Sequence, residues 1–455
     1  MEFTPWTLFT DFGFISLLLI IGTLLRAKVK VAQFLFLPAS LSAGLLGLLL
    51  GPNGYGIIPF SNHIGMYTGI LTAIIFGSLP LGAQKTPIKG IMRRVSSMWA
   101  YAQSLTILQW GGGMLFALLV LKLAWADLPN GFGLVLAAGF VGGHGTAAAV
   151  GEAFSDHWED AATLGMTSAT MGIICGIVGG LLLIKRSTIK GETSFITNFD
   201  DLPNELRTGL IPKEERKSLG ANTVSTMSID PLAFHLSFIG IIAVCGYYVS
   251  QWGTALFPAI SIPVFSTAFI IGLLLNKLLQ FIKADNYVDK KVVDRISSGA
   301  TDLLVAFGIA SINLGVVIDY AVPLAFLLLF GLLYILVFVY YIAPRMFKEH
   351  WFEKAIFSWG WATGTVAMGM VFLRIVDPEG KSKTLDDYAL AYVGVGIMDI
   401  LIVSLAPVLV MTGQHWLFTI VSVLVGIGIL LITRWQGWWE NPTSQPSQQQ
   451  GKSTM

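Results

Sequence analysis

Apolar runs of about 20 residues recur along nearly the whole chain. A helix needs about 20 mostly apolar residues to cross the hydrocarbon core of a bilayer. Only 12% of the 455 residues are charged, about half the share found in soluble chains. The sequence therefore predicts an all-α polytopic membrane protein. Its expected spans lie near 7–25, 33–50, 64–83, 96–121, 161–184, 232–251, 259–276, 298–318, 322–343, 387–409 and 416–433.

The remaining composition excludes several other classes of protein. The net charge is +1, so the chain has no basic field for nucleic acid. Cys175 and Cys245 lie in separate apolar runs, and we interpret them as small core residues rather than a disulfide or a metal site. The first apolar run lacks a basic leader and a small-residue cleavage site, so residues 7–25 are expected to form a permanent span.

Two apolar segments, 131–151 and 355–373, are broken by glycine and threonine. Arg26, Lys28 and Lys30 follow the first span, so the positive-inside rule places the N-terminus outside. If 131–151 crossed fully, the basic residues that follow the next span would also lie outside. The loop charges therefore predict two re-entrant hairpins, the first entering from outside and the second from the cytoplasm, with a cytoplasmic C-terminus.

The two halves of the chain share a weak repeat. Pro38 and Pro263 each precede a Gly-Leu-Leu-Leu run by the same number of residues, and the Gly145-Thr146 pair of the first hairpin matches Gly364-Thr365 of the second. Because the matching spans run in opposite directions, we expect two inverted-topology repeats of about five spans, each with one re-entrant hairpin. Secondary transporters are built in this way.

This division predicts five parts of the chain. The parts are repeat 1 at 1–185, a cytoplasmic linker at 186–230, repeat 2 at 231–410, an additional C-terminal span at 411–439 and a disordered tail at 440–455.

The first hairpin is the strongest candidate for a substrate site. Gly143 and Gly145 allow the backbone to turn and a ligand to approach closely. Thr146 supplies a hydroxyl, and the helix that starts there offers unpaired N–H groups to an anion. The alternative is that these glycines serve only tight helix packing. His144 is either a ligand or, as a lone histidine more often is, a structural hydrogen-bonding residue.

Other polar residues within the spans complete the predicted substrate site. Thr363, Gly364 and Thr365 lie in the second hairpin, whose tryptophans we interpret as packing residues. Further candidates are Gln109, Asn313 and Arg374. Gln109 is also explained by a helix–helix hydrogen bond, and Arg374 by anchoring at the inner interface.

The best candidate ligand for a coupling cation is Asp399, a carboxylate in the middle of a span. Thr365, Ser168 and Thr170 provide further oxygens for Na⁺. The alternative for Asp399 is a structurally paired buried acid. Gly172, Gly176, Gly179 and Gly180 form a series that we interpret as a packing face without chemistry.

The stretch Gly142-Gly143-His144-Gly145-Thr146 resembles the first hairpin of the sodium/glutamate symporter family. The similarity extends through Thr170-Met171-Gly172 and includes the Asp399 span. It implies a Na⁺-coupled importer of L-glutamate in a bacterial inner membrane, a lipid-embedded homodimer with an elevator-like movement and no cofactor beyond Na⁺. The second hairpin departs from the family pattern, with Thr365-Val366 in place of a Thr-Pro step.

Three alternatives remain open. The same scaffold can serve another carboxylate or a proton-coupled reaction. A channel is a remote alternative, because hairpin repeats also occur in pores. An intramembrane aspartic protease is equally remote, since the spacing around Asp399 is wrong and no second aspartate motif accompanies it. We therefore expect a transporter and not an enzyme.

Overall fold

The computed structural model describes residues 3–34, 37–82, 88–195, 208–213, 216, 218–256, 262–347, 349–377 and 380–439. No β-strand occurs among them, so the all-α prediction is confirmed for this part of the chain. The predicted disordered tail 440–455 and the middle of the linker 186–230 lie outside the described residues.

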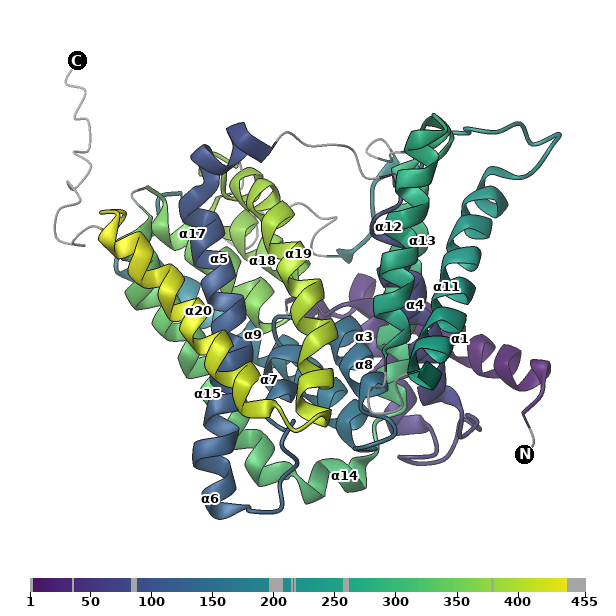
Figure 1. The fold of residues 1–455 in the computed structure, drawn as a ribbon, viewed down its shortest axis with the longest axis horizontal. Helices are drawn as coiled ribbons and strands as arrows, with labels where there is room; N and C mark the ends of the chain where they lie inside the picture. The colour runs from purple at the N-terminus through teal and green to yellow at the C-terminus, as the bar shows by residue number, and fades with distance from the viewer. Residues whose placement is uncertain are drawn as a thin grey trace.

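The helices form two lobes (Figure 1). The first, which we call the framework lobe, contains the helices α1 (Pro5–Lys28), α2 (Lys30–Phe34), α3 (Ala39–Leu50), α4 (Tyr67–Ser78), α11 (Pro231–Leu256), α12 (Val264–Phe281) and α13 (Lys290–Ala310). The second, which we call the hairpin lobe, contains α5 (Ile88–Phe116), α7 (Leu134–Gly139), α8 (Gly143–Ala153), α9 (Ala161–Ile189), α15 (Ala321–Val337), α17 (Trp351–Thr363), α18 (Val366–Val376), α19 (Thr384–Met411) and α20 (His415–Trp435).

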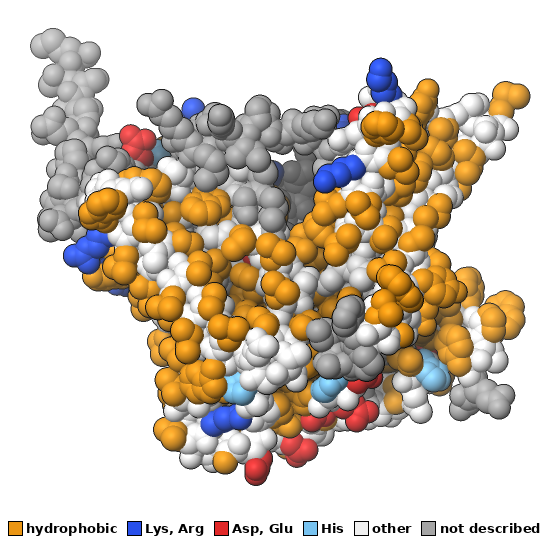
Figure 2. Space-filling model, viewed as in Figure 1, with side chains coloured by type: hydrophobic (Ala, Val, Ile, Leu, Met, Phe, Trp, Pro, Cys, Tyr) orange, Lys and Arg blue, Asp and Glu red, His pale blue; other side chains and the backbone are white. Residues whose placement is uncertain are grey.

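Seven helical segments in the described ranges are long and apolar enough to cross a membrane, which supports a multi-pass membrane protein. They are Pro5–Lys28, Val95–Ala124, Ala161–Ile189, Pro231–Leu256, Val264–Phe281, Ala321–Met346 and His415–Trp435. Apolar side chains cover most of the face in Figure 2, whereas charged side chains gather mainly toward its upper and lower margins.

Two predicted spans are wrong as single helices. In 33–50, Leu37 and Pro38 lie outside any helix, between the end of α2 and the start of α3. The segment 298–318 is divided, because α13 ends at Ala310 and a separate short helix, α14 (Leu314–Asp319), follows. The Asn313 side chain accepts a hydrogen bond from the Gly315 N–H at 2.9 Å and caps α14. An asparagine that bonds to its own backbone two residues on competes with helix continuation, which explains the break.

Both segments predicted to be broken are hairpins of two packed helices. The first hairpin joins α7 to α8 through residues 140–142, and the second joins α17 to α18 through Gly364 and Thr365. The helices of the first hairpin cover 134–153, so they begin and end slightly later than the predicted 131–151, and those of the second extend beyond both predicted limits, to 351–376. Gly360 and Gly369 allow close contact within the second hairpin, since a Cβ at either glycine would strike the backbone of the opposite helix.

The lobes contact each other mainly where α4 packs against α8 and α13 packs against α8 and α9. The C-terminal helix α20 packs against α5 and α19, and therefore belongs to the hairpin lobe. A Cβ on Gly111 of α5 would lie 2.8 Å from the Ser422 Cβ, and Gly426 of α20 lies equally tightly against Leu108. These glycines let α5 and α20 pack closely.

The cysteine interpretation needs one correction. Both cysteines are free, but Cys245 is exposed on α11 and is not a core residue. Its helix packs on the framework lobe through one face, and none of the described residues covers the opposite apolar face, which carries Cys245. Cys175 on α9 is half-buried.

Asp289 fixes the start of α13. Its carboxylate accepts hydrogen bonds from the N–H groups of Ala221 at 2.6 Å and Lys291 at 2.7 Å, and its own N–H donates to the His235 Nε2 at 2.8 Å. The Ala221 amide, first among these donors, lowers the pKa of Asp289. A carboxyl group with a lowered folded-state pKa contributes stability at neutral pH, and this contribution is lost as the pH falls through that folded pKa.

Replacing Asp289 with alanine should cost about 1 kcal/mol, the usual loss for a helix N-cap, and should release the chain around Ala221. Limited proteolysis is expected to cut the Asp289→Ala protein faster near that residue at neutral pH. Asp294→Ala is the control, because its exposed pair with Lys290 at 3.1 Å contributes little. Equal cleavage of both variants would contradict this role of Asp289.

Candidate functional site

The tips of the two hairpins meet inside the hairpin lobe. Gly143 has φ +66°, a conformation that favours glycine, and a Cβ built on it would lie 3.2 Å from the Gly364 carbonyl oxygen. A side chain at position 143 would therefore be strained and would press on the second hairpin. The two Gly-Thr pairs recognised in the sequence thus lie at one place in the fold.

Each tip is the start of a helix. The helix α8 begins at Gly143, and α18 begins at Val366 with Thr365 as its N-cap, whose hydroxyl accepts from the Met368 N–H at 3.3 Å. Unpaired N–H groups and the positive end of the helix dipole favour an anion at such a position. In the second hairpin, α17 ends at Thr363 and leaves its last carbonyls at the tip, where they favour a cation.

The helix α9 packs against both hairpins. A Cβ on Gly172 or Gly176 would strike Thr363, and one on Gly179 or Gly180 would strike the second hairpin farther along, at Trp359 and Phe372. The prediction that these four glycines form a packing face is confirmed. They let the second hairpin lie directly on the α9 backbone.

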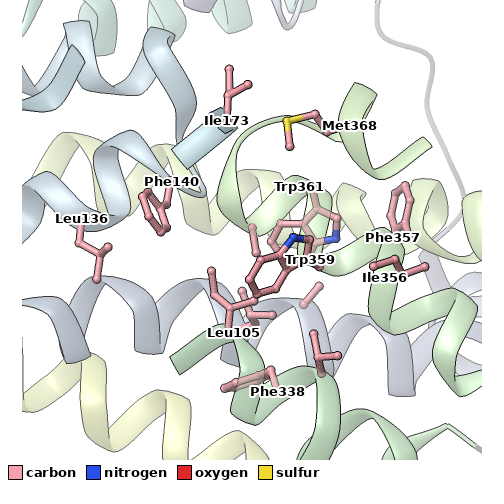
Figure 3. Close-up of a cluster of buried hydrophobic side chains, with 14 of the residues drawn as sticks. Leu105, Leu136, Phe140, Ile173, Phe338, Ile356, Phe357, Trp359, Trp361 and Met368 are labelled. Atoms are coloured by element: carbon pink, nitrogen blue, oxygen red, sulfur yellow. The ribbon is translucent and has the colours of Figure 1, made fainter. Parts of the chain in front are cut away.

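The tryptophans of the second hairpin lie in a buried apolar cluster with Leu105, Phe338 and Ile356 (Figure 3). Trp359 donates its Nε1–H to the Gly176 carbonyl at 2.8 Å, which ties α17 to α9. Trp361 packs on the Tyr388 ring of α19, with ring centroids 5.6 Å apart. The packing interpretation holds for both rings, although the buried Trp361 Nε1 has no hydrogen-bond partner among the described residues.

His144 connects the first hairpin to α9. Its Nε2 lies 3.1 Å from the Thr170 Oγ1, and that hydroxyl also donates to the Met166 carbonyl at 2.9 Å. A threonine hydroxyl has a single hydrogen, so the His144 Nε2–H is the donor to Thr170. This contact supports the structural interpretation of His144 and occupies part of the Thr170 hydroxyl that we predicted as a Na⁺ ligand.

The first turn of α8 has space beside it. A Cβ built on Gly145 would meet no atom within 4 Å, whereas one on Gly142 would strike Thr146. Thr146 is buried, with its side chain against the turn that precedes α8. The predicted substrate residues of the first hairpin therefore surround a turn that is tightly packed at Gly142 and open at Gly145.

Three predicted site residues carry buried oxygens that have no hydrogen-bond partner among the described residues. These atoms are the Gln109 Oε1, the Ser168 Oγ and the Asp399 Oδ1. The Gln109 Nε2 donates to the Ala362 carbonyl of α17 at 3.2 Å, so the predicted helix–helix hydrogen bond exists and leaves the Oε1 unused. Ser168 lies beside Gly139 at the end of α7. Buried acceptors without partners are costly, and bound ligands are one means of satisfying them.

Two predicted substrate residues lie away from the tips. Asn313 is exposed and uses its side chain to cap α14 at the lower edge of Figure 1. Arg374 is also exposed, eight residues after the start of α18 and therefore about 12 Å along that helix. The structure therefore assigns Asn313 to helix capping and places Arg374 away from the hairpin tip, neither of which follows from the apolar pattern of the sequence.

One polar residue of this region was not among the predicted site residues. Glu152 lies in the last turn of α8, where it contacts α4 of the framework lobe through Thr72, at 3.1 Å. The sequence signal that could have identified Glu152 is that it is the single carboxylate in the apolar run from Ala147 to Phe154.

These features define a class: an all-helical, multi-pass membrane protein with two broken-helix hairpins whose tips meet within one lobe. The sequence model of the sodium/glutamate symporter family matches residues 8–370, which contain both hairpin tips. The chain belongs to this family of membrane transport proteins. No curated protein matches the chain.

Proposed function

We propose that this protein is a secondary transporter that moves L-glutamate, or a closely related anionic amino acid, into the cell together with Na⁺. The observation that carries this proposal is the contact between the hairpin tips. There, two helix N-termini meet, and the same lobe carries buried oxygens that lack partners in the described structure. The first feature suits a carboxylate and the second suits a hard cation.

Each group of residues has a separate role in the proposed site. The N–H groups at the start of α8, with the Thr146 hydroxyl, hold a substrate carboxylate beside the open position at Gly145. Asp399, Ser168 and the carbonyls at the end of α17 supply oxygens to Na⁺, with Thr365 and Thr170 at its margin. Na⁺ bound there orders the tips and increases the affinity for the substrate, as thermodynamic linkage requires of coupled ligands.

The order of the helices supports an inverted repeat. A π-helical turn, Ala117–Leu121 before the first hairpin and Phe338–Ile342 before the second, occurs at the same place in both halves. The helices α8 and α18 both have 11 residues, and α3 and α12 both begin directly after a proline. In our proposal the two halves have opposite orientations and their exchange of roles produces alternating access.

The proposed movement is that of the hairpin lobe along the framework lobe. The hairpin lobe contains both tips and the predicted ligands Gln109, Ser168 and Asp399, so it can carry the solute as one body. We further propose a homodimer in a bacterial inner membrane, with a periplasmic N-terminus and a cytoplasmic C-terminus. The positions of the basic loops support this orientation.

Purified protein in liposomes provides the test. An inward Na⁺ gradient should drive uptake of labelled L-glutamate, and replacement of Na⁺ by K⁺ should abolish it. Uptake driven equally by either cation would contradict Na⁺ coupling, and uptake of a different carboxylate alone would contradict the substrate.

Thr146→Val should reduce the initial rate of this uptake by about tenfold, the effect of losing a hydrogen bond to a charged group of about 1.4 kcal/mol. The expression and thermal stability of the variant should stay close to those of the wild type. Thr167→Val is the matched control on α9, because the Thr167 hydroxyl bonds only the Thr163 carbonyl of its own helix, at 2.8 Å, among the described residues. Similar rates for the two variants would remove Thr146 from the substrate site.

A further inference from the structure

Glu152 is an unused acidic group at the contact between the two lobes. It lies on α8, nine residues after Gly143, and therefore about 13 Å along the helix from the hairpin tip. Half of the hydrocarbon core measures about 15 Å, so a tip near the middle of the bilayer leaves Glu152 within the apolar layer. Its side chain packs over Gly69 of α4, where an added Cβ would lie 3.2 Å from the carboxyl carbon.

The Thr72 hydroxyl is the hydrogen-bond partner of the Glu152 carboxyl group among the described residues. The Thr72 Oγ1 lies 2.7 Å from the Gly69 carbonyl oxygen and 3.1 Å from the Glu152 Oε2. A hydroxyl has one hydrogen to donate, so Thr72 shares it between these two acceptors, and the Gly69 carbonyl is the nearer. Thr72 therefore does little to stabilise a negative charge on Glu152.

No basic side chain compensates a charge on Glu152 in the part of the chain that the structure describes. The helices packed against α8 are α4, α7, α9, α13 and α19. Their titratable groups within the apolar layer, together with that of α8 itself, are Tyr67, Cys175, Asp302, Tyr388, Tyr392, Asp399 and His144. Tyr67 bonds Asp11, and His144 bonds Thr170, so neither is a partner of Glu152.

We infer that Glu152 is a proton-binding site, and that the hairpin lobe moves past α4 with this carboxyl group in its neutral form. A proton from the solution open to the site attaches to the Oε2, beside Thr72, before the lobe moves. The acid is needed again for the return of the empty lobe, so the proton makes both movements possible without a net transfer across the membrane. A charged carboxylate in the apolar contact is costly and the acid is not, so protonation permits the movement.

This inference rests on the proposed function for its role in transport, but the site itself can be tested without transport. Infrared difference spectra of the purified protein at neutral pH should contain the carbonyl stretch of a protonated carboxylic acid. This band should be absent in Glu152→Gln and shifted in Thr72→Val, which removes the hydrogen-bond partner of the carboxyl group. The exposed acid Asp156, four residues along the chain, provides the control: Asp156→Asn should leave the band unchanged. A wild-type protein without the band overturns the inference.

The role of the neutral acid in the movement is tested by the pH dependence of uptake in liposomes. Uptake by the wild type and by Asp156→Asn should slow as the pH rises and Glu152 loses its proton. Glu152→Gln should retain its uptake over the same pH range, because the amide resembles the neutral acid. An equal loss of uptake with rising pH in Glu152→Gln overturns the inference. Loss of uptake at every pH in Glu152→Gln with rescue by Glu152→Asp also overturns it, since a charged cation ligand would then be required.

The two proposals can fail separately. If the infrared band is present but no glutamate moves, the proposed function fails and the proton site stands. If glutamate moves with Na⁺ and the band is missing, the proton site fails and the proposed function stands.

Discussion

Gly172→Val is expected to separate the second hairpin from α9 and to abolish transport. A Cβ at this position would strike the Thr363 carbonyl and lie 2.9 Å from the Phe140 ring. The valine therefore pushes against the backbone of one hairpin and a buried ring of the other, and neither can move independently. Overpacking of this kind costs about 1–3 kcal/mol, and the displaced tip no longer meets Gly143.

Thermal unfolding in detergent and Na⁺-driven uptake in liposomes measure the two effects of Gly172→Val. The control is Gly428→Val on α20, since a Cβ at Gly428 would meet no atom within 4 Å. That variant should retain stability and uptake close to those of the wild type. If Gly172→Val also retained both, the close contact between α9 and the second hairpin would be wrong.

Asp399→Asn should remove the response of the protein to Na⁺. The Asp399 Oδ1 is buried without a partner in the described structure, and the amide retains the shape of the side chain while losing its charge. The concentration of Na⁺ required for half-maximal uptake should increase by at least about tenfold, which corresponds to about 1.4 kcal/mol.

A binding measurement separates this effect from a defect in movement. Na⁺ should raise the midpoint of thermal unfolding of the wild-type protein, because a ligand that binds only the folded state stabilises it. The same addition should have little effect on Asp399→Asn. Asp302→Asn is the control, since Asp302 lies on α13 of the framework lobe and interacts with Ser40. Normal stabilisation of Asp399→Asn by Na⁺ would exclude Asp399 as a ligand.

The positions of the two hairpins could be predicted because glycine and threonine interrupt otherwise apolar runs, and loop charges restrict the direction of each run. The packing role of the α9 glycines could be predicted for a similar reason, since their spacing places them along the helix. The division of 298–318 was missed because apolar composition continues through Ser311 and Asn313, although the asparagine caps a new helix.

The site was harder to predict than the fold, because hydrogen-bond partners come from helices that are distant in sequence. Nothing near Thr170 indicates that its hydroxyl bonds His144, and nothing near Glu152 indicates Thr72. Asn313 and Arg374 are polar residues next to apolar runs, yet the structure leaves both exposed. Sequence patterns identify which residues are costly in a membrane, whereas tertiary packing determines which of them meet.

Because α20 packs closely against α5, the C-terminal helix should move together with the hairpin lobe during transport. The two ends of the described chain report on different halves of the molecule, because α1 lies in the framework lobe and α20 in the hairpin lobe. Spin labels at Trp6 and Arg434, both exposed, would therefore record the movement of the hairpin lobe along the framework lobe as a change in the distance between the labels. Cys175 and Cys245 would first be replaced so that they do not take up label.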